Sequence, residues 1–175
     1  MIRQVVSAAV LACVTMTAPA WCEQMTSARG GMNNKSFAML GRFEPTASGF
    51  RGHTALAITY SWAAADRYAT VEYTQSSTDV VVAAQPASVT SEAFTVIAGA
   101  RKWQGGWYYG GGAGLSHLET DTLTPAGILS DKETNLAWEV LIGAPFGGRG
   151  LAELKYVDAG DDGARGFAAF VGVRY

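Results

Sequence analysis

The sequence carries little charge. Lys, Arg, Asp and Glu make up only 16% of its 175 residues, against about 25% in an average soluble domain. Basic residues number 13 and acidic residues 15, giving a formal charge of −2 without a basic cluster. Nucleic acid is therefore not expected as a partner.

Long hydrophobic runs and cysteines are also scarce. After residue 20 no window reaches the roughly 18 apolar residues that a membrane-spanning helix needs, although 49% of the chain is hydrophobic and 11% aromatic. This richness in apolar residues excludes disorder. We therefore expect one domain that exposes apolar surface without using transmembrane helices.

The N-terminus has the pattern of an export signal. Arg3 precedes an uncharged apolar stretch, which ends in the small residues Ala18 to Ala20. Residues 1-20 are predicted to be a cleaved signal peptide, and residues 21-34 a polar lead-in. Because only Cys22 would remain after cleavage, no internal disulfide is expected. Export without disulfides suits the periplasm or outer membrane of a Gram-negative bacterium.

The rest of the chain, residues 35-175, alternates with period two, which indicates strands. Gly, Asn, Ser and Pro divide it into eight apolar runs of about 10 residues, the length of a tilted transmembrane strand. The runs are 35-43, 52-62, 67-75, 93-103, 107-118, 134-144, 150-158 and 166-175. The predicted fold is all-β, an eight-stranded antiparallel up-and-down transmembrane β-barrel.

The two faces of these strands differ in polarity. One face is strongly apolar, and the other holds small and polar residues together with nearly all of the charges. A lipid-facing wall excludes charge, whereas a soluble barrel or sandwich would turn its apolar face inward. We therefore place seven charges in the interior: Arg42, Glu72, Arg101, Glu139, Glu153, Lys155 and Arg174.

Turn lengths test these faces, because opposed residues in a hairpin lie on the same face. A tight turn at Gly105-Gly106 would set Trp103 opposite Tyr108. A five-residue connection, Pro145 to Arg149, would set Glu139 directly opposite Lys155. Eight strands leave an interior just wide enough for side chains, so an ion-pair network is expected to close the lumen. Its predicted members are Glu139, Lys155, Glu153, Arg101 and Arg174.

Aromatic residues are expected in two belts on the outer face, at the lipid-water interfaces. The belt at the short-turn end contains Tyr60, Trp62, Trp107 and Tyr109, and the belt at the loop end contains Phe43, Tyr73, Phe94 and Tyr156.

The chain ends in an aromatic residue preceded by apolar residues at alternate positions: Phe167, Val171, Val173 and Tyr175. This ending resembles the C-terminal signal of outer-membrane barrels, which in that family is read by the barrel-assembly machinery. Residues 107-116 and 151-156 likewise resemble strands of small OmpA/OmpX-type and opacity-type surface proteins. The resemblance implies an outer-membrane barrel without a periplasmic domain, surrounded by lipid and lipopolysaccharide.

Function would then lie in the exposed loops, above all 76-92 and 119-133, since rigid scaffolds often present binding residues on loops. The resemblance suggests host or other extracellular proteins as ligands, or a purely structural role. Val80 to Val82 could extend the third strand beyond the membrane. We expect a monomer without cofactor or metal.

Two alternatives remain at this point. Some eight-stranded barrels modify lipid A with a Ser/His pair, but Ser116 and His117 are adjacent and would point to opposite faces of a strand. No enzymatic activity is therefore expected. The other alternative is a soluble periplasmic β-barrel that binds a ligand.

Overall fold

The structure, a computed structural model, describes residues 35–62, 66–82, 84–104, 106–146 and 149–174. The predicted signal peptide and lead-in lie outside these ranges. Within them the chain forms antiparallel strands and a single 3-10 turn, η1. The elements are β1 (Lys35–Pro45), β2 (Arg51–Gly52), β3 (Thr54–Trp62), β4 (Arg67–Val82), β5 (Gln85–Gln104), β6 (Trp107–Thr124), β7 (Gly127–Phe146), β8 (Gly150–Asp158), η1 (Asp162–Ala164) and β9 (Arg165–Arg174).

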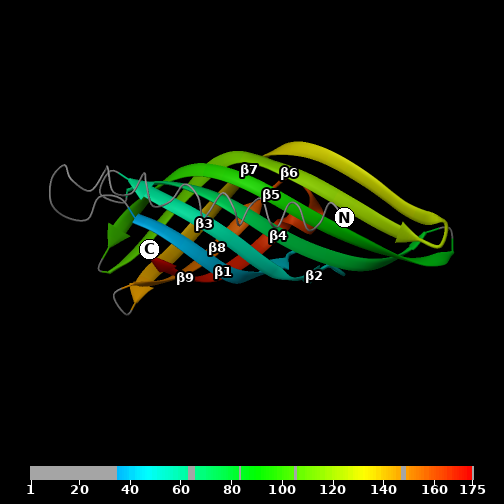
Figure 1. The fold of residues 1–175 in the computed structure, drawn as a ribbon, viewed down its shortest axis with the longest axis horizontal. Coiled ribbons are helices and arrows are strands. Elements are labelled where there is room, and N and C mark those ends of the chain that lie inside the picture. Colours follow the sequence, from blue (N-terminus) through cyan, green and yellow to red (C-terminus); the bar gives the residue numbers. More distant parts are fainter. Residues whose placement is uncertain (1–34, 63–65, 83, 105, 147–148, 175) are drawn as a thin grey trace. The chain divides into compact units, whose positions relative to one another are not determined.

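Eight of the strands form a closed ring. Each long strand pairs with its neighbours in the chain, β9 returns to pair with β1, and β4 pairs with β5. The two-residue β2 extends the line of β3 along β4. The predicted up-and-down eight-stranded barrel is confirmed (Figure 1). None of the described residues forms a helix long and apolar enough to cross a membrane.

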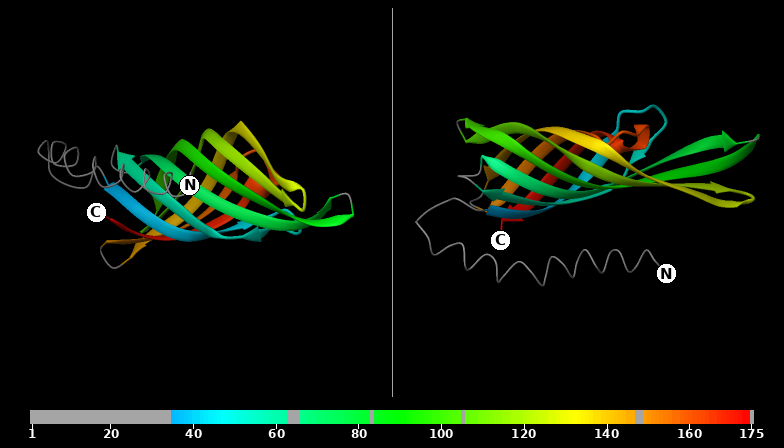
Figure 2. Two further views of the ribbon diagram at one scale, coloured as in Figure 1. Left: turned by 45° about the vertical axis from the view of Figure 1, so that its right-hand side comes forward. Right: turned by 90° about the horizontal axis from the view of Figure 1, so that it is seen from above.

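Four strands are longer than the sequence predicts. β4 and β5 pair as far as Val82 and Gln85, and β6 and β7 pair as far as Thr124 and Gly127. Most of the predicted loops 76-92 and 119-133 therefore belong to two hairpins, which project beyond the rest of the barrel (Figure 2). Only two residues separate the last paired positions at each tip, and Ala84 at the first tip has φ +64°.

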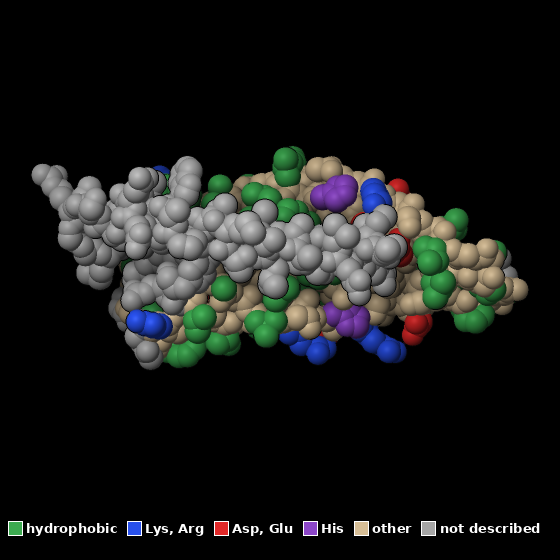
Figure 3. Space-filling model, in the orientation of Figure 1, with side chains coloured by type: hydrophobic (Ala, Val, Ile, Leu, Met, Phe, Trp, Pro, Cys, Tyr) green, Lys and Arg blue, Asp and Glu red, His purple; other side chains and the backbone are tan. Residues whose placement is uncertain are grey.

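The small and polar face points inward, and the apolar face points outward. Along β3, for example, Ala55, Ala57, Thr59 and Ser61 are buried, whereas Leu56 is 47% exposed. The same division holds in β7, where Leu136 is 81% exposed and Glu139 is 1% exposed. Apolar side chains accordingly spread over the outer surface (Figure 3). A soluble barrel would show the opposite arrangement.

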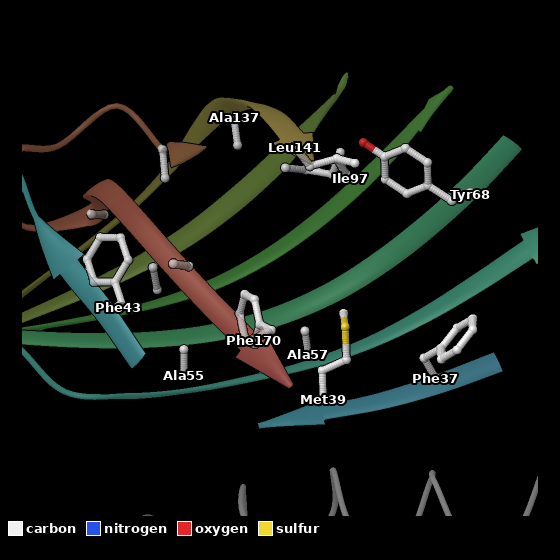
Figure 4. Packing of buried hydrophobic residues seen from close by; sticks show 14 of the residues in the cluster. Phe37, Met39, Phe43, Ala55, Ala57, Tyr68, Ile97, Ala137, Leu141 and Phe170 are labelled. Atoms are coloured by element: carbon white, nitrogen blue, oxygen red, sulfur yellow. The ribbon is translucent and has the colours of Figure 1, made fainter. Parts of the chain in front are cut away.

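The first strand is reversed relative to the prediction. Phe43 is buried at 1% exposure, and Arg42 lies outside, where it pairs with Glu44 at 3.1 Å. Figure 4 shows Phe43 among the interior side chains. Phe43 is therefore not part of an outer aromatic belt, and Arg42 is not a lumen charge. Large apolar residues occur on both faces of β1, such as Leu40 outside and Met39 inside, so alternation could not orient it. Pairing with β3 and β9 does.

Candidate functional site

The barrel interior contains a cluster of buried charges. Lys155 Nζ on β8 lies 2.8 Å from Glu72 Oε2, 3.3 Å from Glu139 Oε2 and 3.2 Å from Glu153 Oε1. All four residues are at most 4% exposed. The three carboxylates come from β4, β7 and β8, so the cluster links opposite sides of the ring.

The predicted register between β7 and β8 is wrong by two residues. Lys155 is paired with Leu141, and Glu139 with Val157, because the turn contains three residues rather than five. Pro145 and Phe146 continue the strand instead of forming the turn. A shift of two keeps every side chain on the same face, so face assignment could not reveal the error. Glu139 still reaches Lys155, but diagonally.

Two buried tyrosines, Tyr68 and Tyr108, lie over glycines of the inner face, and one of them bonds to the cluster. Tyr108 donates a 2.6 Å hydrogen bond to Glu153 Oε2. Its hydroxyl lies 2.5 Å from where a Cβ on Gly143 would be. The Tyr68 hydroxyl likewise lies close to two glycines. It is 2.6 Å from where a Cβ on Gly99 would be and 2.9 Å from where a Cβ on Gly112 would be. Glycine is needed at these positions because a methyl group would occupy the space of the phenol.

Arg101 lies on the short-turn side of the cluster. Its guanidinium is 4.7 Å from the ring centre of Tyr108 and 5.3 Å from that of Tyr68, and it donates a hydrogen bond to Ser61. The interaction with two aromatic faces is a cation-π arrangement. Of the predicted network, the structure brings Glu139, Glu153 and Lys155 together and places Arg101 beside the rings of Tyr68 and Tyr108. The side chain of Arg174 lies outside the described part of the chain.

Glu72 is the member that the prediction omitted. Its inward orientation on β4 followed from alternation, but its contact with Lys155 crosses the barrel between strands that are not neighbours. Such a contact depends on strand tilt and stagger, which fix the heights of side chains around a barrel. No local pattern in the sequence carries that information.

The loop end of the interior is covered by the connection between β8 and β9. Gly163 and Ala164 of η1 are buried, and Ser76 on β4 donates a 2.6 Å hydrogen bond to the Gly163 carbonyl. Asp161 caps the turn by accepting a 2.7 Å hydrogen bond from the Gly163 amide. The predicted loop 159-165 thus reaches across the mouth of the barrel to β4.

The remaining predicted belt residues lie on the outer face. At the short-turn end Tyr60 stacks on Trp62, with ring centres 6.0 Å apart, and Trp107 contacts Tyr109 at 5.5 Å. At the other end Tyr156 contacts Trp138 at 5.5 Å and Phe167 at 5.2 Å. Two belt residues from the predicted set, Tyr73 and Phe94, are paired across β4 and β5.

The residues considered for catalysis are separated. Ser116 is fully buried and makes a 2.9 Å hydrogen bond with Thr95. The neighbouring His117 points outward and contacts Thr134 at 3.2 Å. In the C-terminal motif, Phe167, Val171 and Val173 lie on the outer face of β9, and Tyr175 is outside the described residues.

Similar architectures occur among solved structures. Ail, the attachment invasion locus protein of Yersinia pestis, matches with 13% sequence identity and a TM-score of 0.55, over 83% of this chain and all of that chain. Ail in complex with the heparin analogue sucrose octasulfate matches at 14% identity and TM-score 0.54, covering 82% of this chain and 98% of that one. The N-terminal β-barrel domain of Pseudomonas aeruginosa OprF matches at 12% identity and TM-score 0.52, over 83% of this chain and all of the domain.

The chain has the fold of the small eight-stranded outer-membrane β-barrels. This likeness concerns architecture, because the identities are low. No protein-family model and no curated protein sequence matches the chain. As an outer-membrane-type barrel it combines an apolar outer wall with a charged interior, and its two long hairpins extend from one end.

Proposed function

We propose that the protein is an integral outer-membrane surface barrel of a Gram-negative bacterium, with a closed lumen and exposed hairpins that make surface contacts. One observation carries the proposal: the large apolar side chains point outward, and the ion pairs of the Lys155 cluster point inward. Large side chains at 44–81% exposure, such as Trp138, Val140 and Leu136, would be unfavourable in water. A lipid environment removes this cost.

Export and assembly follow from the two ends of the chain. Residues 1-20 would direct secretion, and the motif Phe167, Val171, Val173 and Tyr175 would engage the barrel-assembly machinery. Lipid and lipopolysaccharide would then surround the outer face. We expect a monomer, since the ring of strands is closed.

Membrane fractionation with heat-dependent gel mobility tests this location. A membrane barrel stays folded in unheated detergent and migrates differently after boiling. Recovery in the outer-membrane fraction with such a shift would support the proposal. Recovery in the soluble periplasmic fraction would contradict it and favour a soluble binding barrel.

The closed lumen is a separate part of the proposal. The Lys155 cluster crosses the interior, and η1 covers the loop end, so no continuous water path is expected. Purified protein should produce no steady ion conductance in planar lipid bilayers. Stable single-channel steps that disappear with a cluster variant would show that the interior conducts.

The hairpins of β4–β5 and β6–β7 are the proposed contact surfaces. Exposed apolar side chains occupy their tips, including Val81, Leu123, Ile128 and Leu129. Glu119, Asp121, Asp131 and Glu133 lie closer to the barrel. Because acidic residues prevail here, we do not expect heparin-like polyanions to bind, in contrast with the complex described for Ail.

Hairpin deletions test this role. Residues 78–89 can be replaced by an Asn-Gly turn, because Ser77 and Thr90 are paired. The shortened barrel should fold while losing adhesion of expressing cells to protein-coated surfaces. Unchanged adhesion in this variant and in the matching deletion of 122–129 would contradict the contact role and leave a structural one.

We expect no enzymatic activity, since Ser116 and His117 do not share a face. The test is mass spectrometry of lipid A from a deletion strain. An altered acylation pattern that is restored by the wild-type gene would instead favour a lipid-modifying enzyme.

A further inference from the structure

The tips of the two long hairpins are uncharged and apolar. The sequence has no charged residue between Asp79 and Glu92, and none between Asp121 and Asp131. Large apolar side chains in these segments are 44–75% exposed: Val81, Val82, Leu123, Ile128 and Leu129. Hydrophobic side chains are visible at this end of the molecule (Figure 3). Because the hairpins project beyond the barrel (Figure 2), lipid around the barrel wall would not cover them.

Both faces of the tips expose apolar side chains. Val81 and Val82 are adjacent in β4, and Ile128 and Leu129 are adjacent in β7. Adjacent residues of a strand point to opposite faces of the sheet, and all four of these side chains are exposed. A protein that packs on one face would cover only one residue of each pair. A lipid layer can surround a tip from every side.

The geometry of the tips limits how deeply they can enter lipid. Pairing between β5 and β6 ends at Ser88 and Leu123, so each tip is a two-stranded hairpin. The outer edges of such a hairpin present polar backbone groups, which are costly in hydrocarbon. Three residues separate Asp79 from the end of β4, and three separate Asp121 from the end of β6. At about 3.3 Å per residue this uncharged length is about 10 Å, the depth of the headgroup region and its boundary with the acyl chains.

Charge selects the type of lipid. Counted from the tip, the first charged residue is acidic on all four strands: Asp79, Glu92, Asp121 and Asp131. Shallow insertion brings these carboxylates close to the headgroups, where anionic lipids would repel them. Zwitterionic choline headgroups carry no net charge and would not. The anionic lipopolysaccharide of the cell's own surface is disfavoured for the same reason.

We propose that the two tips, residues 80–87 and 122–130, insert shallowly into a second, zwitterionic lipid membrane. This inference goes beyond the contact role proposed above, because it names a lipid surface as the partner of the tips. It rests on the proposed location, since an outer-membrane barrel would direct these hairpins away from its own bilayer.

Flotation with vesicles tests the insertion. The full-length mature barrel is placed in phosphatidylcholine nanodiscs, mixed with separate phosphatidylcholine vesicles and centrifuged through a density gradient. Nanodiscs with the wild-type barrel should float with the vesicles, and empty nanodiscs should not. Val81→Asn combined with Leu129→Asn should lower binding about tenfold or more, because two apolar side chains no longer favour lipid.

The matched control is Thr90→Asn, at a polar position below the tips. It should bind like wild type, and heat-dependent gel mobility should show that all of these variants are folded. Equal binding by the double variant and wild type would overturn the proposal. So would a wild-type barrel that does not float with the vesicles.

Lipid composition provides a separate test. Replacing part of the phosphatidylcholine by phosphatidylglycerol should weaken binding at low salt, and added salt should reduce the difference by screening the charges. Stronger binding to the anionic vesicles would contradict the role assigned to the acidic residues.

Fluorescence quenching measures depth directly. In a Cys22→Ser background, Leu129→Cys and Thr90→Cys are labelled with an environment-sensitive fluorophore. Brominated lipids in the added vesicles should quench the label at 129 and not the label at 90. Quenching at neither position or at both positions would contradict shallow insertion of the tips.

These experiments separate the inference from the proposed location. A heat-modifiable barrel that enters nanodiscs but ignores the vesicles would contradict the lipid contact alone. Recovery of the protein in the soluble periplasmic fraction would contradict the location, whatever the vesicles show.

Discussion

Single residues in this barrel depend strongly on which face they occupy. Lys155 and Lys132 both form ion pairs with glutamates, at 2.8 Å and 3.0 Å. The Lys155 pair is 1% exposed, whereas Lys132 is 56% exposed. Buried pairs leave an uncompensated charge when one partner is removed, and exposed pairs contribute little.

We expect Lys155→Ala to lower the free energy of unfolding by about 3–5 kcal/mol, because it leaves buried carboxylates without their counterion. Lys132→Ala is the control and should cost less than about 1 kcal/mol. Urea unfolding in lipid vesicles measures both. Equal midpoints for Lys155→Ala and wild type would contradict the ion-pair role.

Gly143 provides a second test at the residue scale. A methyl group there would stand 2.5 Å from the Tyr108 hydroxyl, which would push the phenol away from Glu153. Gly143→Ala should therefore lower the free energy of unfolding by about 1–3 kcal/mol, the usual cost of overpacking. In a Tyr108→Leu background the same change should cost less. Equal costs in the two backgrounds would show that the phenol does not require the glycine.

Among the elements, β7 and β8 show the limits of alternation. Both the predicted and the observed register keep charges inside and apolar residues outside, and only the position of the turn separates them. The observed turn leaves Phe146 paired with Gly150. A Cβ on Gly150 would stand 2.5 Å from the Phe146 ring, so the aromatic ring lies against the glycine. The pairing of these two residues continues both strands to this point.

Cysteine cross-linking should distinguish the two registers. Val140 and Tyr156 are paired in the structure, whereas the predicted register pairs Val140 with Leu154. Directly opposed residues have Cβ atoms about 4.5–5.5 Å apart and diagonal ones about 7–8 Å, beyond easy disulfide geometry. In a Cys22→Ser background, the cysteine pair at 140 and 156 should oxidise faster than the pair at 140 and 154. The reverse order would restore the predicted register.

The molecule as a whole is defined by its reversed polarity. Leu136, Val140 and Val171 are each more than half exposed, and the interior holds five described charges: Glu72, Arg101, Glu139, Glu153 and Lys155. In water this arrangement would be unstable, because the hydrophobic effect favours the opposite one. The surrounding medium must therefore be apolar between the two aromatic belts.

Depth-dependent substitution tests this conclusion. Val140 lies on β7 between Trp138, which contacts Tyr156 of the loop-end belt, and Ile142, which is paired with Tyr109 of the other belt. Val140→Arg should cost about 2–4 kcal/mol in a lipid bilayer, the value for a cation at the midplane. Leu129→Arg at the hairpin tip should cost close to nothing. Similar costs at both positions would contradict a lipid-facing wall.

The sequence by itself determined the class of the fold, the order of the strands and the outward face of most of them. Period-two alternation and turn residues are local features of the sequence, and they occur in any barrel of this type. Alternation failed in β1, where Phe43 and Leu40 put large apolar side chains on both faces, and at the hairpin tips, where Ala84 gives no turn signal. It also failed for the β7–β8 register, because a slip of two preserves both faces.

Tertiary structure decided which charges meet. Glu72 and Lys155 are 83 residues apart in the chain, and their contact depends on the tilt and stagger of the closed ring. The covering of the mouth by η1, which reaches Ser76 on β4, arises in the same way. These contacts join segments that are distant in sequence, so their geometry exists only once the ring has closed.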